Sequence, residues 1–251
     1  MGINQEGIEK NEGRSIKRVK KANLYLAKVE NKMQKQKIVQ KIDPDILQFL
    51  KVRKEVPVNT MIILINIVVF FLTELTGSSL DGKHLVEWGA AYTPLIQEGH
   101  EYYRFFTCMF LHFGLTHLGN NMLVLFFLGD CLERAVGRVR YLFIYISGGM
   151  GASLISYLSE VRIGENVVSA GASGAIFAVV GALIYVVIRN KGRLENFTTK
   201  KLLFLAALTL YHGVTSTGVD NAAHFGGFLC GFVLAVLIYR GQKNGRGLKK
   251  F

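Results

Sequence analysis

Residues 58–75 read VNTMIILINIVVFFLTEL and contain no charged side chain before Glu74. A helix needs roughly 20 predominantly apolar residues to cross a bilayer core of about 30 Å. This stretch therefore predicts a membrane-spanning helix. Five further apolar runs follow it, at 109–129, 141–158, 170–188, 202–217 and 222–239. Together the six runs predict an all-α membrane protein with six transmembrane helices.

The 251-residue chain has a net charge of +12, and its Lys and Arg residues are unevenly placed. They gather in residues 1–57, between the second and third apolar runs, between the fourth and fifth, and after Tyr239. The other three connections are poor in Lys and Arg. Because cytoplasmic loops carry the excess of basic residues, this alternation predicts that both termini are cytoplasmic. The topology accounts for the basic charge, so nucleic acid is not an expected partner.

Hydropathy and charge divide the chain into a basic cytoplasmic segment at 1–57, a six-helix domain at 58–239 and a basic cytoplasmic tail at 240–251. From Ser15 to about Ile42, apolar residues recur at helical spacing among lysines. This pattern fits either an amphipathic helix on anionic lipid or a solvated cytoplasmic arm. The three cysteines lack CxxC spacing, so neither a zinc site nor a disulfide framework is expected.

Polar side chains inside a membrane are costly, so their positions point to function. Three polar groups lie near the starts of the second, fourth and sixth runs, and these runs all cross from the outside to the inside in the predicted topology. The groups are HFGLTHLGNN at 112–121, SAGASG at 169–174 and DNAAHFGG at 220–227.

Four residues of these groups, His117, Asn121, Ser173 and His224, are thereby expected at one depth in the outer half of the bilayer. Each alone suits a contact between packed helices, but a common depth is hard to explain by independent packing choices. Small residues at four-residue spacing would also let the fourth and sixth helices approach closely. These residues are Gly174, Ala178 and Ala182 on the fourth helix, and Gly227, Gly231 and Ala235 on the sixth.

The residue types of this group fit nucleophilic catalysis. A serine hydroxyl is a weak nucleophile unless a base removes its proton, and His224 can be that base for Ser173. No carboxylate within the membrane stands out as the third member of a catalytic triad, because Asp220 is more plausibly the N-cap of the sixth helix. A Ser173–His224 dyad is therefore the expected catalytic pair.

Acyl transfer also needs hydrogen-bond donors for the developing oxyanion. His117, Asn121 and the backbone N–H of Ser173 could supply them, the last at a helix N-terminus. Gly171 and Gly174 would allow a tight turn and close approach of a substrate. Phe177 lies one helical turn after Ser173, and we expect its ring to stack on His224.

In their order along a six-helix plan, these motifs resemble the rhomboid intramembrane serine proteases of the six-helix bacterial type. HFGLTHLGNN resembles the second-helix motif of the family, GASG its nucleophile motif, and AHFGGFLCG its sixth-helix histidine with a glycine ridge. Tyr103-Arg104 resembles the aromatic–arginine pair of the first outer loop, and Glu133-Arg134 an acid–base pair after helix two. Phe177 replaces a tyrosine common in bacterial relatives, and Tyr103 replaces a tryptophan.

The resemblance implies Ser173 as nucleophile, His224 as base, His117 and Asn121 as oxyanion donors, with no metal or cofactor. It implies structural roles for Arg104 and Glu133. It also implies a water-filled cavity open to the extracytoplasmic side of a cell membrane, the plasma membrane in bacteria. The expected substrates are transmembrane helices cut near their outer ends, where helix-breaking residues expose the peptide bond. The sequence sets no oligomeric state.

Two other interpretations use the same residues. An inactive rhomboid-like protein could grip transmembrane helices without cutting them, although such relatives typically lack the serine or the histidine. A metal or ion transporter could use His112, His117 and His224 as ligands. That interpretation leaves Ser173 unexplained and finds no intramembrane acid beside the histidines.

Overall fold

The computed structural model describes residues 52–191 and 219–241, together with Lys28, Arg193, Leu194, Phe197, Thr198 and Lys200. The chain forms two compact units, Met1–Lys54 and Glu55–Phe251. All elements below belong to the second unit. The predicted span at 202–217 and both interpretations of the basic N-terminal segment fall outside the described residues.

Four apolar helical segments in the described ranges are long enough to cross a membrane. Three of them agree with the predicted runs to within a few residues, but the second extends over Gly114–Val136 rather than 109–129. Residues 108–110 form a 3₁₀ turn instead, so His112 precedes the helix. The segments are α3 (Pro57–Thr76), α7 (Gly114–Val124) continued through η2 (Leu125–Gly129) and α8 (Asp130–Val136), α9 (Arg138–Ile163) and α12 (Asn221–Ile238).

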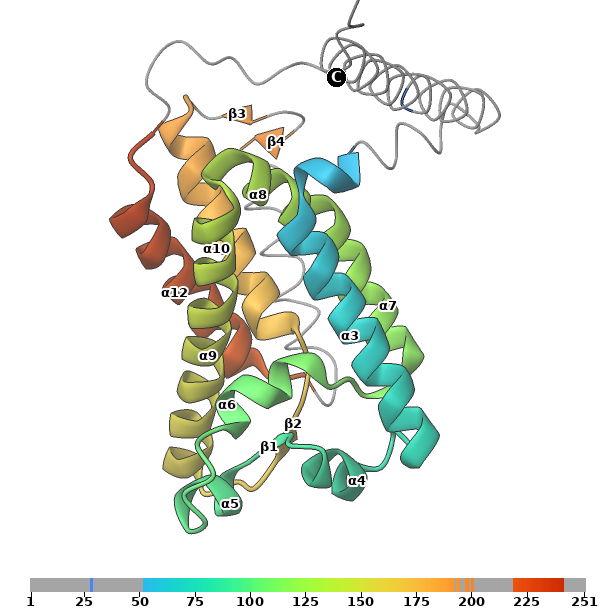
Figure 1. Cartoon of the computed structure of the whole chain (residues 1–251). Coiled ribbons are helices and arrows are strands. Elements are labelled where there is room, and N and C mark those ends of the chain that lie inside the picture. Colours follow the sequence, from blue (N-terminus) through green and yellow to red (C-terminus); the bar gives the residue numbers. More distant parts are fainter. Residues whose placement is uncertain are drawn as a thin grey trace, which may run out of the picture. The chain divides into compact units, whose positions relative to one another are not determined.

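Helix α10 (Ser173–Arg189) is shorter and is the buried centre of the bundle. In Figure 1 it runs between α9 and α12 on one side and α3 and α7 on the other. Thirteen of its residues are buried, and they lie on all sides of the helix. A helix buried all round must be apolar all round, which explains the uninterrupted run Ala175–Ile184.

Helix α3 is equally apolar but lies at the edge of the bundle. It begins with Pro57, a residue that suits the first helical position because its missing N–H has no partner there. Only one stripe of α3 is buried, and the rest of its apolar surface is exposed, as expected for a helix against lipid. The buried stripe consists of Asn59, Ile62, Asn66, Phe70 and Thr73.

The connection from α3 to α7 folds into short helices at one end of the bundle (Figure 1). Its strand β1 pairs antiparallel with β2, so that Ala91 lies opposite Ser169 and Tyr92 opposite Val168. This end therefore joins the outer connection to the segment just before Ser173. Its elements are α4 (Gly82–Glu87), β1 (Ala91–Tyr92), α5 (Thr93–Gln97), α6 (Arg104–Thr107), η1 (Cys108–Phe110) and β2 (Val168–Ser169).

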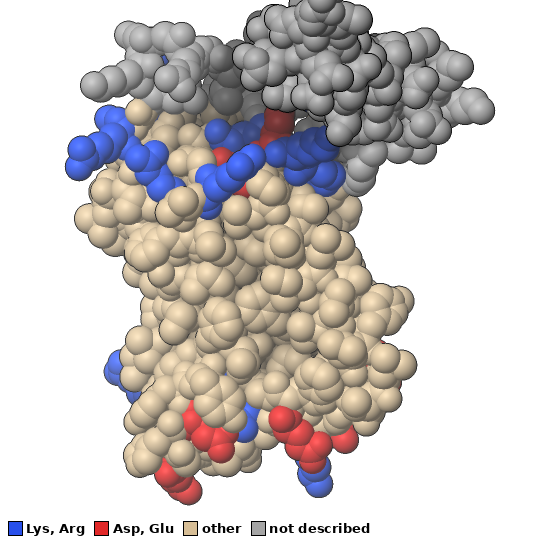
Figure 2. Space-filling model, in the orientation of Figure 1, with Lys and Arg blue, Asp and Glu red and all other residues tan. Residues whose placement is uncertain are grey.

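Charged side chains lie at the two ends of the bundle, with an uncharged band between them on the face drawn in Figure 2. The end that carries α4 and α5 shows most of the acidic groups. The opposite end shows most of the basic ones, near α8 and the hairpin of β3 (Arg193–Leu194) and β4 (Phe197–Thr198). An uncharged band of this kind is typical of a protein that spans a bilayer.

Candidate active site

The turn that leads into α10 presents Ser173 as the first residue of the helix, with its side chain half-buried. Gly171 in this turn has φ of +153°, a conformation that residues with a Cβ rarely adopt. A Cβ added there would lie 2.8 Å from Cε1 of His117 and 3.6 Å from Oγ of Ser173. His117 and Ser173 therefore border the same small space, which is kept open by the missing side chain of Gly171.

Two further contacts hold this turn in place. The N–H of Gly171 donates to the carbonyl of Cys108 at 2.9 Å. The N–H of Ala172, the N-cap of α10, donates to Nε2 of His112 at 3.4 Å. Since Nε2 accepts a hydrogen bond, the neutral imidazole of His112 carries its proton on Nδ1. No local sequence pattern predicts this contact of His112 with Ala172.

His112 is 1 % exposed, and its ring lies edge-on to that of His117 with centroids 5.2 Å apart. Burial, with a smaller effect of the nearby His117, lowers the pKa of His112 to about 3. The ring therefore stays neutral at physiological pH and remains an acceptor for the Ala172 N–H.

Helix α12 brings His224 to the same region. Asp220 caps the helix by accepting from the N–H of Ala223 at 2.8 Å, as predicted. One turn later the ring of His224 stacks on that of Phe177, with centroids 4.4 Å apart and an interplanar angle of 22°. The expected contact between these two rings is therefore present.

The two ridges of small residues face one another, which explains how α10 and α12 come so close. A Cβ added at Gly227 would overlap the carbonyl of Gly174, and one added at Gly231 would overlap the carbonyl of Ala178. A Cβ at Gly174 would lie 2.7 Å from Cβ of Ala152 on α9 and 3.8 Å from Ala223. Glycine is therefore required sterically along this seam.

Several buried polar atoms at the site have no hydrogen-bond partner within the described ranges: Nδ1 of His112, Nδ2 of Asn121 and Nδ1 of His224. The same part of the chain contains no hydrogen bond between the hydroxyl of Ser173 and the ring of His224. Buried polar groups are normally satisfied, and catalytic hydrogen bonds often form only with substrate bound. The site thus offers unused donors and acceptors beside a serine. Within the described residues, no group of three or more His, Cys, Asp or Glu side chains could hold a metal ion.

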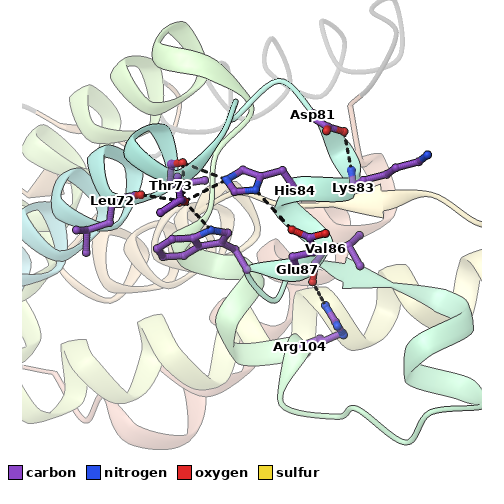
Figure 3. A network of polar contacts seen from close by, with 10 residues as sticks. Leu72, Thr73, Asp81, Lys83, His84, Val86, Glu87 and Arg104 are labelled. Atoms are coloured by element: carbon purple, nitrogen blue, oxygen red, sulfur yellow. Dashed lines mark hydrogen bonds and ion pairs between the residues drawn. The ribbon is translucent and has the colours of Figure 1, made fainter.

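Arg104 joins separate parts of the outer connection to one another. Its guanidinium donates to the carbonyl of Val86 at 2.7 Å (Figure 3) and to that of Ala90 at 2.8 Å, and it pairs with the carboxylate of Glu101 at 2.6 Å. The hydrogen bond from Tyr103, then that from Arg104, lowers the pKa of Glu101.

A second set of contacts, formed by His84 and Trp88, joins the same connection to the end of α3. Nε2 of His84 lies 3.1 Å from the carbonyl of Thr73 at the end of α3, and Trp88 donates to Oγ1 of Thr76 at 3.1 Å (Figure 3). These contacts fix the end of α3 to the outer connection.

Glu133 lies at the opposite end of the bundle and caps α3, although it is far from α3 in the sequence. It is 1 % exposed, and its carboxylate accepts from the N–H groups of Val58 and Asn59 at 3.1 and 2.7 Å. The side chain of Asn59 in turn donates to Asp130 and accepts from the hydroxyl of Tyr141. Neither Arg104 nor Glu133 lies beside Ser173, so their contacts are structural.

The site therefore belongs to a multi-pass helical membrane protein with a serine and three histidines clustered at the start of its central helix. The Rhomboid domain model matches residues 99–241, which is more than half of the chain. The chain belongs to the rhomboid family.

Relatives of the chain come from bacteria and plants. It is 35 % identical over 178 residues to rhomboid protease GluP of Bacillus subtilis, a match that covers 71 % of this chain and 34 % of the relative. It is 35 % identical over 198 residues to rhomboid protease AarA of Providencia stuartii, covering 70 % of each. RHOMBOID-like protein 5 of Arabidopsis thaliana is 42 % identical over 157 residues, covering 61 % of this chain and 50 % of the relative. The chain thus spans a third of GluP and half of the plant protein.

Proposed function

We propose that the chain is an intramembrane serine endopeptidase that hydrolyses peptide bonds in or near transmembrane helices of other membrane proteins. The observation that carries this proposal is the seam between α10 and α12. There the missing side chains of Gly174 and Gly227 let two helices touch immediately behind Ser173 and His224. The names of relatives GluP and AarA, both rhomboid proteases, support the same reaction.

In this proposal Ser173 and His224 form the catalytic dyad. The hydroxyl of Ser173 attacks the carbonyl carbon of the scissile bond while His224 takes its proton. The same proton passes to the leaving amine when the tetrahedral intermediate collapses to an acyl-enzyme. Water, deprotonated by His224, then attacks the acyl-enzyme, and the same proton passes to the oxygen of Ser173 as the carboxylic acid product is released. The stacked ring of Phe177 keeps the imidazole in one orientation during these steps.

The oxyanion of the intermediate would be bound by His117, Asn121 and the backbone N–H of Ser173. Nδ2 of Asn121 is buried and has no hydrogen-bond partner among the described residues, and a donor in that state is available to a developing negative charge. Each such donor typically lowers the barrier by about 2.7–4 kcal/mol. Gly171 leaves room for the substrate carbonyl between His117 and Ser173.

We also propose the six-helix arrangement, with the fifth crossing at 202–217 and the termini at 1–57 and 240–251 on the cytoplasmic side. The basic end of the bundle in Figure 2 supports this orientation, because basic residues favour the cytoplasmic face. The site would then open toward the extracytoplasmic side, of the plasma membrane in a bacterium. Single transmembrane helices with a helix-breaking residue near that side are the proposed substrates.

The test is cleavage of a helical substrate by the purified protein reconstituted in liposomes. Ser173→Ala and His224→Ala should each abolish cleavage without changing thermal unfolding, and a fluorophosphonate probe should label wild type at Ser173 only. Cleavage by Ser173→Ala at the wild-type rate would refute the assignment of the nucleophile. A wild-type protein that binds the substrate but neither cuts it nor reacts with the probe would instead indicate a non-catalytic helix-binding protein.

A further inference from the structure

The carboxylate of Asp220 makes more contacts than an N-cap requires. One oxygen, Oδ1, accepts from the N–H of Ala223 and caps α12. The other, Oδ2, accepts from the hydroxyl of Ser156 at 2.5 Å and from that of Ser169 at 3.0 Å. Capping uses one acceptor, so the second oxygen serves a different purpose.

The partners of Oδ2 lie on the segments that lead to the site. Ser169 is in β2, four residues before Ser173, and Ser156 is on α9. Asp220 itself is four residues before His224. A single side chain therefore contacts the segment that carries the proposed nucleophile, the helix that carries the proposed base, and the helix packed against both.

A second carboxyl group extends this cluster to the outer connection. Oε1 of Glu160 lies 3.4 Å from the hydroxyls of both serines, and Oε2 accepts from Thr93 of α5 at 2.5 Å. Each serine hydroxyl has one proton, and the shorter bonds direct both protons to Asp220. With both serine protons directed to Asp220, a proton on Oε1 of Glu160 would let that oxygen donate to one of the two serine hydroxyls.

We propose that Asp220 is a positioning residue, which sets the separation between Ser173 and His224 through its bonds to Ser156 and Ser169. This inference rests on the proposed dyad. Asp220 acts through its neighbours, because its side chain hydrogen-bonds with Ser156, Ser169 and Ala223, and the ring of His224 contacts Phe177 instead. Hydrogen bonds to an ionised acceptor are stronger and shorter than neutral ones, which suits contacts that must hold three segments in a fixed geometry.

The test separates the effect of the serine hydrogen bonds to Oδ2 from the effect of the N-cap bond to Oδ1. Ser156→Ala with Ser169→Ala removes both partners of Oδ2 and leaves the bond from Ala223 to Oδ1 intact. Asp220→Ala removes the N-cap bond and both serine bonds together. Asp220→Asn restores both, because its amide oxygen can cap Ala223 and its N–H groups can donate to the serine oxygens. Glu165→Gln, an exposed acid on the same stretch, is the matched control.

Each variant is measured for kcat and KM on the reconstituted helical substrate, for the rate of fluorophosphonate labelling at Ser173, and for thermal unfolding. Because a misplacement of about 1 Å can cost about 100-fold in rate, the serine double variant should lose about 10- to 100-fold in kcat and in labelling rate. KM should change less than about twofold. Asp220→Asn should stay within about threefold of wild type, and Glu165→Gln should match it.

Wild-type kcat and labelling in the serine double variant would overturn the proposal, as would a change in KM with kcat unaffected. Activity of Asp220→Asn as low as that of Asp220→Ala would also overturn it. If Asp220→Ala does not fold, the serine double variant carries the test alone. Failure of the dyad itself is recognised separately, because wild type would then not label at Ser173.

Discussion

Gly174→Ala should inactivate the protein by forcing α10 away from α9. The added Cβ would lie 2.7 Å from Cβ of Ala152, whereas unbonded carbon atoms pack at about 3.5–4.0 Å. The two helices must therefore separate by about 1 Å at the residue next to Ser173. Overpacking of this kind costs about 1–3 kcal/mol of folding free energy, and a 1 Å shift of a catalytic group costs about 100-fold in rate.

The chain offers both a control and a rescue for this substitution. A Cβ at Gly119, a helical glycine of α7, meets no atom within 4 Å, so Gly119→Ala should leave cleavage and unfolding close to wild type. Combining Gly174→Ala with Ala152→Gly removes the opposing methyl group and should restore most of the lost activity. The assays are cleavage of the reconstituted substrate and thermal unfolding in detergent. Full activity of Gly174→Ala, or no recovery in the double variant, would refute the steric argument.

Two further predictions concern parts of the bundle away from that seam. Glu133→Gln should lower the free energy of unfolding by about 1.5–3 kcal/mol, measured by thermal or denaturant unfolding, because an amide cannot accept from both Val58 and Asn59 N–H groups. An unchanged stability would show that these bonds do not hold α3. His112 has a folded pKa of about 3, below its ordinary 6.5. Protons then favour the unfolded state, so stability should fall by up to about 1.4 kcal/mol per pH unit as the pH drops from 6.5 toward 3. His112→Gln, which can still accept from the Ala172 N–H, should reduce that slope in pH-dependent unfolding, and an identical slope would contradict the assignment to His112.

Hydropathy alone predicts those parts of the fold that depend on local pattern. The first span at 58–75 is confirmed as α3, Pro57–Thr76, and the last at 222–239 as α12, Asn221–Ile238. The stacking of Phe177 on His224 also follows from four-residue spacing once two helices are known to touch. These features need only periodicity and residue size.

Features held by bonds between distant residues leave no such pattern. The short helices of the outer connection depend on Arg104, whose partners are carbonyls at Val86 and Ala90. The N–H of Ala172 finds its acceptor in His112, 60 positions earlier. A backbone carbonyl has no residue-specific signal, so the sequence cannot indicate which one a side chain will bind. The N-cap role of Asp220 follows from local sequence, but its bonds with Ser156 and Ser169 do not, because no local pattern shows which distant carboxylate a serine hydroxyl will contact.

The distant cap of α3 has a consequence for biosynthesis. The amides of Val58 and Asn59 receive their acceptor from Glu133, which lies 75 and 74 residues further along the chain. At about 5–20 residues per second, a ribosome needs roughly 4–15 seconds to reach Glu133 after making these residues. During that interval the first turn of α3 must find its hydrogen-bond partners in water or lipid headgroups. Its final place in the bundle is therefore set late, when α8 emerges and brings the carboxylate.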